Sequence, residues 1–330
     1  VINKMNEFSL IFILALVLMT GVELWLSLRQ SRYVTAHRNE VPDAFKGQID
    51  LVDHQKAASY TVAKGQLNRV EGICGMIILL LWTIGGGLAW LMESWQVLDW
   101  SEMVLGILFI LSFFVIGTLI ELPFSWYRTF VLEEKFGFNK NSPGLFYTDL
   151  LKQTALMLII GAPLLWGALS LMDSAGEYWW LYLWAAWFAF TLLVMWAYPA
   201  FIAPLFNKFT PLEDIQLKER VESLLSRCGF KSQGIFVMDG SRRSGHGNAY
   251  FTGLGGNKRI VFFDTLLETL NEEQIEAVLA HELGHFRRKH VIKNMAMMAV
   301  LSLISLMLLG WAAAEPWFYK GLGVASETSA

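Results

Sequence analysis

The chain has 330 residues, of which 55% are hydrophobic and 17% are charged, and its formal net charge is −3. Soluble domains are about 25% charged, so this composition excludes an ordinary soluble protein, and the hydrophobicity excludes intrinsic disorder. The two cysteines, Cys74 and Cys228, are too few and too far apart for a disulfide scaffold. The weakly acidic charge balance gives no reason to expect a nucleic-acid partner. We therefore expect an integral membrane protein with a modest soluble part.

Apolar runs long enough to cross a bilayer, about 20 residues each, recur along the chain. We expect about six spanning helices, over residues 8–28, 73–92, 104–120, 156–172, 179–198 and 295–314. The fourth run is short, and Pro163 interrupts it. The first run is longer than the apolar core of a signal peptide and lacks a cleavage site, so we expect it to be retained as a helix.

Glu23 lies inside the first apolar run. A carboxylate in a spanning helix is costly unless it faces water or a polar partner. The sequence leaves two alternatives open: a water-filled chamber beside Glu23, or a position near the helix end that reaches the membrane interface.

Nearly all of the 26 lysines and arginines lie in alternate connecting segments, which are 29–72, 121–155 and 199–294. The connections 93–103 and 173–178 have acidic residues and no basic ones. Because basic loops stay on the cytoplasmic side, we predict that the three basic segments are cytoplasmic and that the N-terminus is outside. The rule applies equally to the bacterial inner membrane and the endoplasmic reticulum, so either location fits.

Residues 199–294 form the longest stretch without a spanning run. We therefore predict that the chain has three parts: a membrane domain over 1–198, a small α+β domain over 199–294, and a further span and tail over 295–330. Prolines at its start predict an irregular exit from the membrane. Periodicity and turn residues then predict, in order, an amphipathic helix ending near Gly229, a strand over 234–239, a hairpin of strands 249–254 and 259–263, and a helix capped by Asn271.

That last helix contains the sequence His281-Glu282-Leu283-Gly284-His285. Histidines four residues apart project from one face of a helix, and imidazole nitrogens are good zinc ligands. Glu282 follows the first histidine and can take a proton from water as that water attacks a carbonyl. This pattern is the zinc-protease motif H-E-x-x-H. The alternative is a pair of surface histidines on a charged helix, but the cap, the apolar face and the preceding hairpin favour catalysis.

A catalytic zinc takes three protein ligands, and the third is not obvious from the sequence. His290 is about 140° around a continuous helix from His285, so we expect it to face away from the metal. Glu315 follows a further spanning run and is a weak candidate. His246, in the loop before the hairpin, is a possible contact on the substrate side.

Both ends of the chain look cut. The chain begins at Val1, with Met5 as a plausible true start, and stops at Ala330 just past a hydrophobic run. We therefore expect the third zinc ligand to lie beyond residue 330.

Ordered sequence blocks of recognisable type extend over nearly the whole chain. They include Phe-Gly-Phe-Asn-Lys at 136–140 and Asn-Ala-Tyr at 248–250. The others are residues 29–30, 56–61, 122–124, 198–199, 203–209, 239–241, 251–255, 258–261, 263–266 and 278–285. In these blocks the chain strongly resembles the type I CaaX prenyl proteases. Those are integral-membrane zinc metallopeptidases of the gluzincin kind, related to the HtpX-like proteases.

The resemblance implies a fold and further site residues. It implies an α-helical polytopic membrane protein, with seven helices when complete, around a water-filled chamber, together with a zincin-like cytoplasmic domain. It also implies that Asn248 and Ala249 bind the substrate backbone beside the hairpin edge, and that a downstream glutamate completes the site of His281 and His285. A later histidine and arginine, which would stabilise the oxyanion, have no matching block in this chain.

The sequence thus predicts a membrane-embedded zinc metalloendopeptidase with Zn²⁺ as its cofactor and Glu282 as its general base. Its expected partners are membrane lipid and a protein or peptide substrate, either a CaaX-type C-terminus or a membrane protein. The alternative is a non-catalytic transporter or scaffold with a vestigial motif. The intact His281, Glu282 and His285 argue against that alternative.

Overall fold

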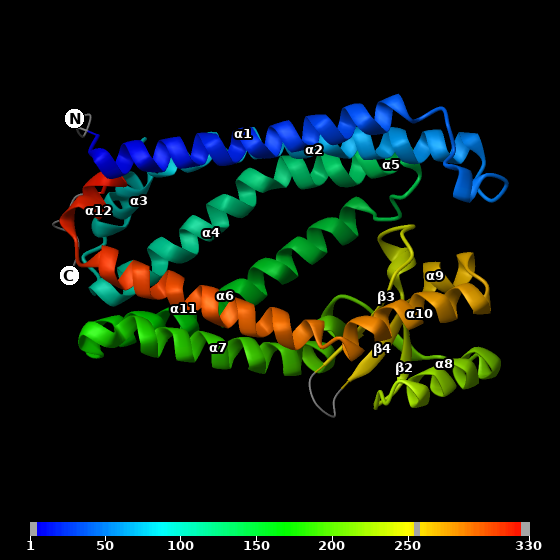
Figure 1. Ribbon diagram of the computed structural model, residues 1–330. Coiled ribbons are helices and arrows are strands. Elements are labelled where there is room, and N and C mark those ends of the chain that lie inside the picture. The colour runs from blue at the N-terminus through cyan, green and yellow to red at the C-terminus, as the bar shows by residue number, and fades with distance from the viewer. Residues whose placement is uncertain (1–4, 254–257, 325–330) are drawn as a thin grey trace. The chain divides into compact units, whose positions relative to one another are not determined.

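The computed structural model describes residues 5–253 and 258–324, and most of them are helical (Figure 1). The helices are α1 (Glu7–Ala36), α2 (Leu51–Trp82), α3 (Gly87–Gln96), α4 (Glu102–Tyr127), α5 (Glu134–Phe136), α6 (Pro143–Ser174), α7 (Trp179–Ala197), α8 (Ile215–Arg227), α9 (Asp264–Thr269), α10 (Glu272–Arg287), α11 (His290–Ala313) and α12 (Pro316–Gly321). The strands are β1 (Phe209–Pro211), β2 (Ile235–Met238), β3 (Ala249–Thr252) and β4 (Arg259–Phe263).

The chain divides into two compact units. The first unit contains Val1–Phe136, Ile160–Leu169 and Trp311–Ala330, and the second contains Gly137–Ile159 and Ser170–Gly310. The second unit includes the sheet and the H-E-x-x-H helix.

Five helical segments of the described residues are long and apolar enough to span a membrane, or six if the bent pair α2 and α3 counts as one span. The five are Glu7–Ala36, Glu102–Phe136, Pro143–Ser174, Gly176–Leu205 and His290–Ala313. Each contains one of the apolar runs found in the sequence, although the run over 295–314 extends one residue past its helix. The predicted polytopic helical fold with about six spans is confirmed.

The second predicted span is not one straight helix. Helices α2 and α3 meet at an angle of 52°, and Gly86 between them has a φ of 81°. Glycine adopts this left-handed conformation without the Cβ clash that other residues suffer. The break therefore falls inside the apolar run 73–92, where hydropathy alone gives no sign of it.

Pro163 interrupts the fourth apolar run but not the helix, because α6 continues through this residue from Pro143 to Ser174. Proline removes one backbone hydrogen bond. Spanning helices tolerate that loss because neighbouring groups and local adjustment of the helix compensate for it.

Helices α1 and α2 run side by side in the first unit (Figure 1). Arg69 of α2 donates hydrogen bonds of 3.0 Å to the hydroxyls of Ser27 and Ser31 on α1. A groove of about 600 Å³ along this pair is lined by Glu23 together with polar residues such as Lys64. Glu23 therefore shares this groove with polar side chains of α1 and α2.

The sheet of the second unit has the strand order β1-β2-β4-β3. Strand β2 is parallel to β4, while β1 and β3 are antiparallel to their neighbours. The predicted strand over 234–239 and the predicted hairpin pairing are confirmed, although residues 254–257 of the hairpin loop lie outside the described residues. Strand β1 was missed: Pro211 suggested only irregular chain, but a proline is tolerated on an edge strand.

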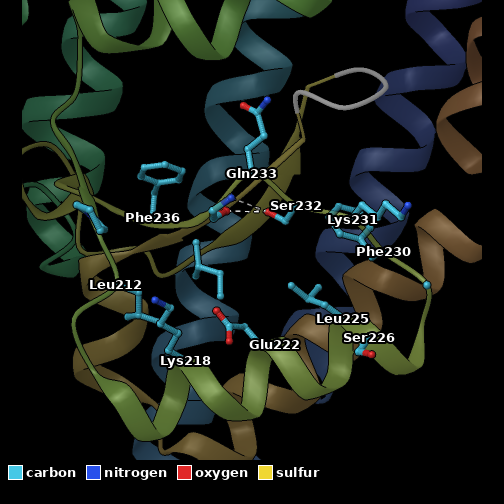
Figure 2. Close-up of a pocket in the computed structure, with 14 residues that line it drawn as sticks. Leu212, Lys218, Glu222, Leu225, Ser226, Phe230, Lys231, Ser232, Gln233 and Phe236 are labelled. Carbon is cyan, nitrogen blue, oxygen red and sulfur yellow. Dashed lines mark hydrogen bonds between the residues drawn. The ribbon is translucent and has the colours of Figure 1, made fainter.

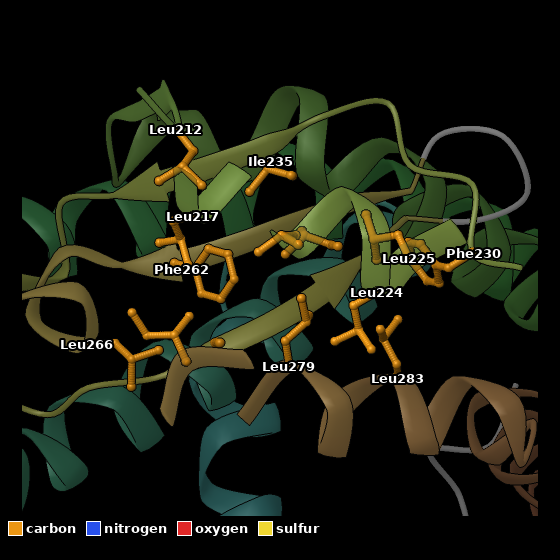
Figure 3. Packing of buried hydrophobic residues seen from close by; sticks show 14 residues of the cluster. Leu212, Leu217, Leu224, Leu225, Phe230, Ile235, Phe262, Leu266, Leu279 and Leu283 are labelled. Atoms are coloured by element: carbon orange, nitrogen blue, oxygen red, sulfur yellow. The ribbon is translucent and has the colours of Figure 1, made fainter. Parts of the chain in front are cut away.

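Helices α8 and α10 and the sheet share one hydrophobic core (Figure 3). Val221 of α8, Ile260 and Phe262 of β4, and Leu279 and Leu283 of α10 are almost completely buried. Helix α8 ends as predicted, because Gly229 takes a φ of 65° and the amide of the next residue bonds back to the Leu225 carbonyl at 2.9 Å. Asn271 caps α10 as predicted, in a reciprocal pair with Gln274.

A partly buried ion pair fixes the loop that leads into β3. The Arg243 guanidinium donates to both carboxylate oxygens of Asp149 on α6, at 2.7 and 3.1 Å. It also donates to the Asn207 side chain at 2.9 Å and to the Phe206 carbonyl at 2.7 Å. Such a planar, bidentate arrangement suits arginine and not lysine. The pair therefore ties α6 and the chain before β1 to the loop at 240–247.

We expect Asp149→Ala to lower the free energy of unfolding by about 3 kcal/mol, at the low end of the cost of breaking a buried ion pair, because it leaves the partly buried Arg243 guanidinium without its counter-charge. Thermal unfolding in detergent measures the effect as a lower melting temperature. The control is Asp173→Ala, which removes an exposed carboxylate from the same helix. Equal melting temperatures for the two variants would contradict a stabilising role for the pair.

Candidate active site

The two motif histidines point to one place on α10. Their Nε2 atoms lie 3.2 Å apart, and their ring centroids are 5.0 Å apart with an interplanar angle of 70°. The side chain of His281 is exposed and that of His285 is half-buried, so solvent can reach this place. The structure thus brings the two predicted metal ligands together.

The separation of these nitrogens fits a shared zinc ion. Zinc binds imidazole nitrogen at about 2.0–2.1 Å in tetrahedral geometry, which places two ligand nitrogens about 3.3 Å apart. Within residues 5–253 and 258–324, no group of three histidine, cysteine or acidic side chains has the arrangement of a metal site. The described part of the chain therefore presents a pair of ligands.

His290 does not face away from the motif, and that expectation is wrong. Its Nδ1 lies 2.8 Å from the Nδ1 of His285. The expectation assumed one continuous helix, whereas α10 ends at Arg287 and α11 begins at His290. Between them Lys289 takes a φ of 56°, so the chain turns and directs His290 back toward His285. No glycine or proline signals this turn, and a pattern-based analysis could not find it.

Glu282 follows His281 on α10 and is half-buried. Its neighbour Leu283 is 1% exposed and packs into the core, which fixes the rotation of the helix about its axis. A residue one position from His281 is about 100° around the helix, so the Glu282 carboxylate borders the histidine face. Its position is compatible with that of a base acting on water at the metal.

Strand β3 forms one edge of the sheet. The Phe263 amide donates to the Asn248 carbonyl at 2.9 Å, so these residues form a hydrogen-bonded pair across the hairpin. Such pairs alternate along an antiparallel ladder, so the backbone groups of Ala249 point to the open side. There the Ala249 amide donates to the side-chain oxygen of Asn248 at 2.9 Å. The residues predicted to bind substrate thus lie on an edge that can accept another strand.

Aromatic packing holds this edge strand beside the motif helix. Phe286, next to His285, packs against Phe251 of β3 with ring centroids 6.3 Å apart. Both rings contact Phe230, and the Lys258 ammonium lies 4.4 Å above the centre of the Phe286 ring. Helix α10 and strand β3 are therefore fixed next to each other in the second unit.

The loop before β3 is held by residues that are distant in sequence. The ring of His246 stacks on Phe138, with ring centroids 4.2 Å apart, and Asn139 pairs with Ser244 in an isolated bridge. His246 thus has a packing role here, which its spacing in the sequence did not indicate.

Tyr250 of β3 stays neutral. Burial, and to a smaller extent nearby Tyr198, raises the pKa of its phenol to about 12.

A separate groove of about 940 Å³ lies between α8 and the segment 229–236 (Figure 2). Lys218 and Glu222 line one side of it, and Ser232 and Gln233 line the other. None of the H-E-x-x-H residues borders it. The chemistry of the motif therefore belongs to the exposed histidine face of α10.

The sequence matches two family descriptions that together cover most of its length. Residues 30–208 match the CAAX prenyl protease N-terminal region of five membrane helices, and residues 211–321 match peptidase family M48. The second match contains the sheet and the H-E-x-x-H helix.

Similar proteins agree with this assignment. The chain is 38% identical to CAAX prenyl protease 1 of Saccharomyces cerevisiae over 84% of its own length and 63% of the relative's. It is 36% identical to the homologues of Dictyostelium discoideum and Arabidopsis thaliana, covering 84% and 88% of its own length and 66% and 70% of theirs. It thus spans about two thirds of the length of these relatives.

A solved structure has the same fold. The crystal structure of S. mikatae Ste24p superposes with a TM-score of 0.87 at 34% identity, covering 96% of this chain and 74% of that one. Membership of family M48 implies a metal cofactor. From the matched regions, the relatives and the shared fold, we conclude that the chain is an integral-membrane member of peptidase family M48, in the CAAX prenyl protease family.

Proposed function

We propose that the protein is a zinc-dependent endopeptidase that hydrolyses peptide bonds at the membrane, with CaaX-type C-termini as its substrate class. The observation that carries this proposal is the convergence of His281 and His285, with Nε2 atoms 3.2 Å apart, on a helix that packs beside an open strand edge. The names of the relatives support the substrate class. No comparison favours a transporter or a scaffold.

The proposed reaction assigns one task to each residue. His281 and His285 would hold the metal through Nε2, and a glutamate, which the family resemblance implies, would be the third ligand. A bound zinc ion supplies Lewis acidity, which polarises a carbonyl and lowers the pKa of water. Glu282 takes the proton of the attacking water and passes it to the leaving amine.

The edge strand positions the substrate in this proposal. An extended peptide adds to β3 by backbone hydrogen bonds, and the outward amide and carbonyl of Ala249 are the groups that it meets. The Asn248 side-chain oxygen now occupies the Ala249 amide. A substrate carbonyl can replace the Asn248 oxygen as the acceptor of the Ala249 amide. The side-chain carboxamide of Asn248 is then free to bind the substrate backbone.

The domain assignment, membrane orientation and partners are part of the same proposal. Residues 1–198 form the membrane domain, 199–294 form the catalytic segment on the cytoplasmic side, and 295–330 add a further span and tail. The N-terminus lies outside, and the membrane is that of the endoplasmic reticulum or the bacterial inner membrane. Lipid surrounds the spans, which explains the many exposed apolar side chains on α1 and α11.

We expect His281→Ala and His285→Ala each to weaken zinc binding at least about tenfold, since even the loss of an outer-sphere partner costs 10- to 100-fold. Elemental analysis of the purified protein, together with competition by a chelator, measures the change. His54→Ala, the same substitution in the other unit, serves as the control. Unchanged zinc content in both motif variants would exclude this pair as the metal site.

We expect Glu282→Gln to keep bound zinc and to lose cleavage of a prenylated CaaX peptide at least about 10²-fold, because the amide cannot accept the proton. Glu273→Gln changes an exposed carboxylate on the same helix and should cleave normally. Full activity of Glu282→Gln would place the general base elsewhere.

The charge asymmetry between connections predicts that a reporter fused after residue 240 behaves as cytoplasmic and that one placed within 93–103 behaves as external. Paired alkaline phosphatase and green fluorescent protein fusions at both positions measure the two sides. The reverse pattern would invert the proposed orientation.

A further inference from the structure

Three imidazoles form a continuous chain in the second unit. His281 contacts His285 through Nε2 at 3.2 Å, and His285 contacts His290 through Nδ1 at 2.8 Å. The His285 and His290 ring centroids are 4.9 Å apart with an interplanar angle of 73°. His285 is therefore the middle ring and uses one nitrogen toward each neighbour.

The contact between His285 and His290 has a defined chemistry. A neutral imidazole has one N–H donor and one bare acceptor nitrogen, so a hydrogen bond between two Nδ1 atoms needs one donor and one acceptor. A metal ligand must present a bare nitrogen. If His285 presents Nε2 to the metal, its proton is on Nδ1, and His290 is the acceptor through its own Nδ1.

The backbone places His290 firmly for this contact. Helix α10 closes with the Arg288 amide bonded to the Gly284 carbonyl at 3.0 Å and the Lys289 amide bonded to the Phe286 carbonyl at 2.9 Å. Helix α11 then starts at His290 and is held against α7 by Trp184, whose indole donates to the Ala299 carbonyl at 3.0 Å. His290 thus approaches His285 from a separate and anchored helix.

With the proposed metal function as its premise, we propose that His290 is a positioning residue for the metal site. Its Nδ1 accepts the Nδ1–H of His285, which holds the His285 ring in the tautomer and orientation that direct Nε2 to the metal. Histidine ligands in metalloproteins usually donate their second nitrogen to such an acceptor, and the loss of that partner weakens binding about 10- to 100-fold. Here a second histidine takes the role that a carboxylate or a carbonyl fills elsewhere.

The test compares His290→Asn with His290→Leu. The Asn side-chain oxygen sits where the histidine has Nδ1 and can accept the hydrogen bond from His285. Leu has nearly the same shape as Asn but has no acceptor atom. The intact protein is purified in detergent and stripped of metal, and Zn²⁺ affinity is measured by competition with a chromophoric chelator. His54→Leu is the control for the same substitution in the other unit.

We expect His290→Asn to bind Zn²⁺ within about threefold of wild type and His290→Leu to bind about 10- to 100-fold more weakly. Melting temperatures of the metal-free proteins show whether each variant folds, and His290→Ala replaces the Leu variant if that one does not. Wild-type affinity in the folded variant that lacks the acceptor, Leu or its replacement Ala, would overturn the inference. Equal weakening in Asn and Leu would overturn it too, because it would make His290 a ligand or a purely structural residue.

The same measurement separates this inference from the proposed function. A wild-type protein that binds no Zn²⁺ overturns the proposed metal function and this inference with it. A wild-type protein that binds Zn²⁺ tightly, with a Leu variant that binds equally well, overturns only the role of His290.

Discussion

The packing of Leu279 and Leu283 against β4 sets the rotation of α10, and the geometry of the candidate site depends on it. Both side chains are almost fully buried beside Phe262. Because successive residues of a helix are about 100° apart, burial of these two leucines directs His281 and His285 to the opposite, accessible side. The hydrophobic core thereby holds two imidazoles at a separation that suits one metal ion, before any metal contributes binding energy.

The position of the edge strand β3 is fixed by the same hydrophobic core, because Ala249 lies in it and Phe251 packs against it. Ala249 is 4% exposed, and its backbone groups are directed to the edge of the sheet that carries no further strand among the described residues. The loop before it is clamped by the ion pair of Arg243 with Asp149, which removes freedom from the chain that carries Asn248. In the proposed function, a substrate strand would add to an edge whose conformation is already fixed, which lowers the entropic cost of binding.

The first unit meets a different constraint, because the bilayer cannot hydrogen-bond to backbone groups. Its long helices satisfy their own amides and carbonyls, and polar side chains gather where α1 and α2 face each other. Arg69 is shared between two serines of α1, and Glu23 lines the same polar groove. Polar residues inside apolar helices therefore mark the helix–helix contact, while apolar residues such as Leu18 remain exposed for lipid.

Local patterns in the sequence determined much of this protein. The six apolar runs, the hairpin, the cap at Asn271 and the i, i+4 spacing of His281 and His285 are all set by residues close together in the chain, so hydropathy and helix geometry were enough to predict them. The roles of Glu282, Asn248 and Ala249 were read from the motif and from family resemblance, and they remain predictions.

Tertiary structure alone decided the features that join distant or irregular parts of the chain. The pairing of β1 with β2 and the clamp of Arg243 on Asp149 depend on partners that no local pattern identifies. His290 is the clearest case. Its place beside His285 depends on the left-handed conformation of Lys289, a residue with no intrinsic preference for it. Helical periodicity assumes that the axis continues, and here the surrounding contacts of α10 and α11 turn it.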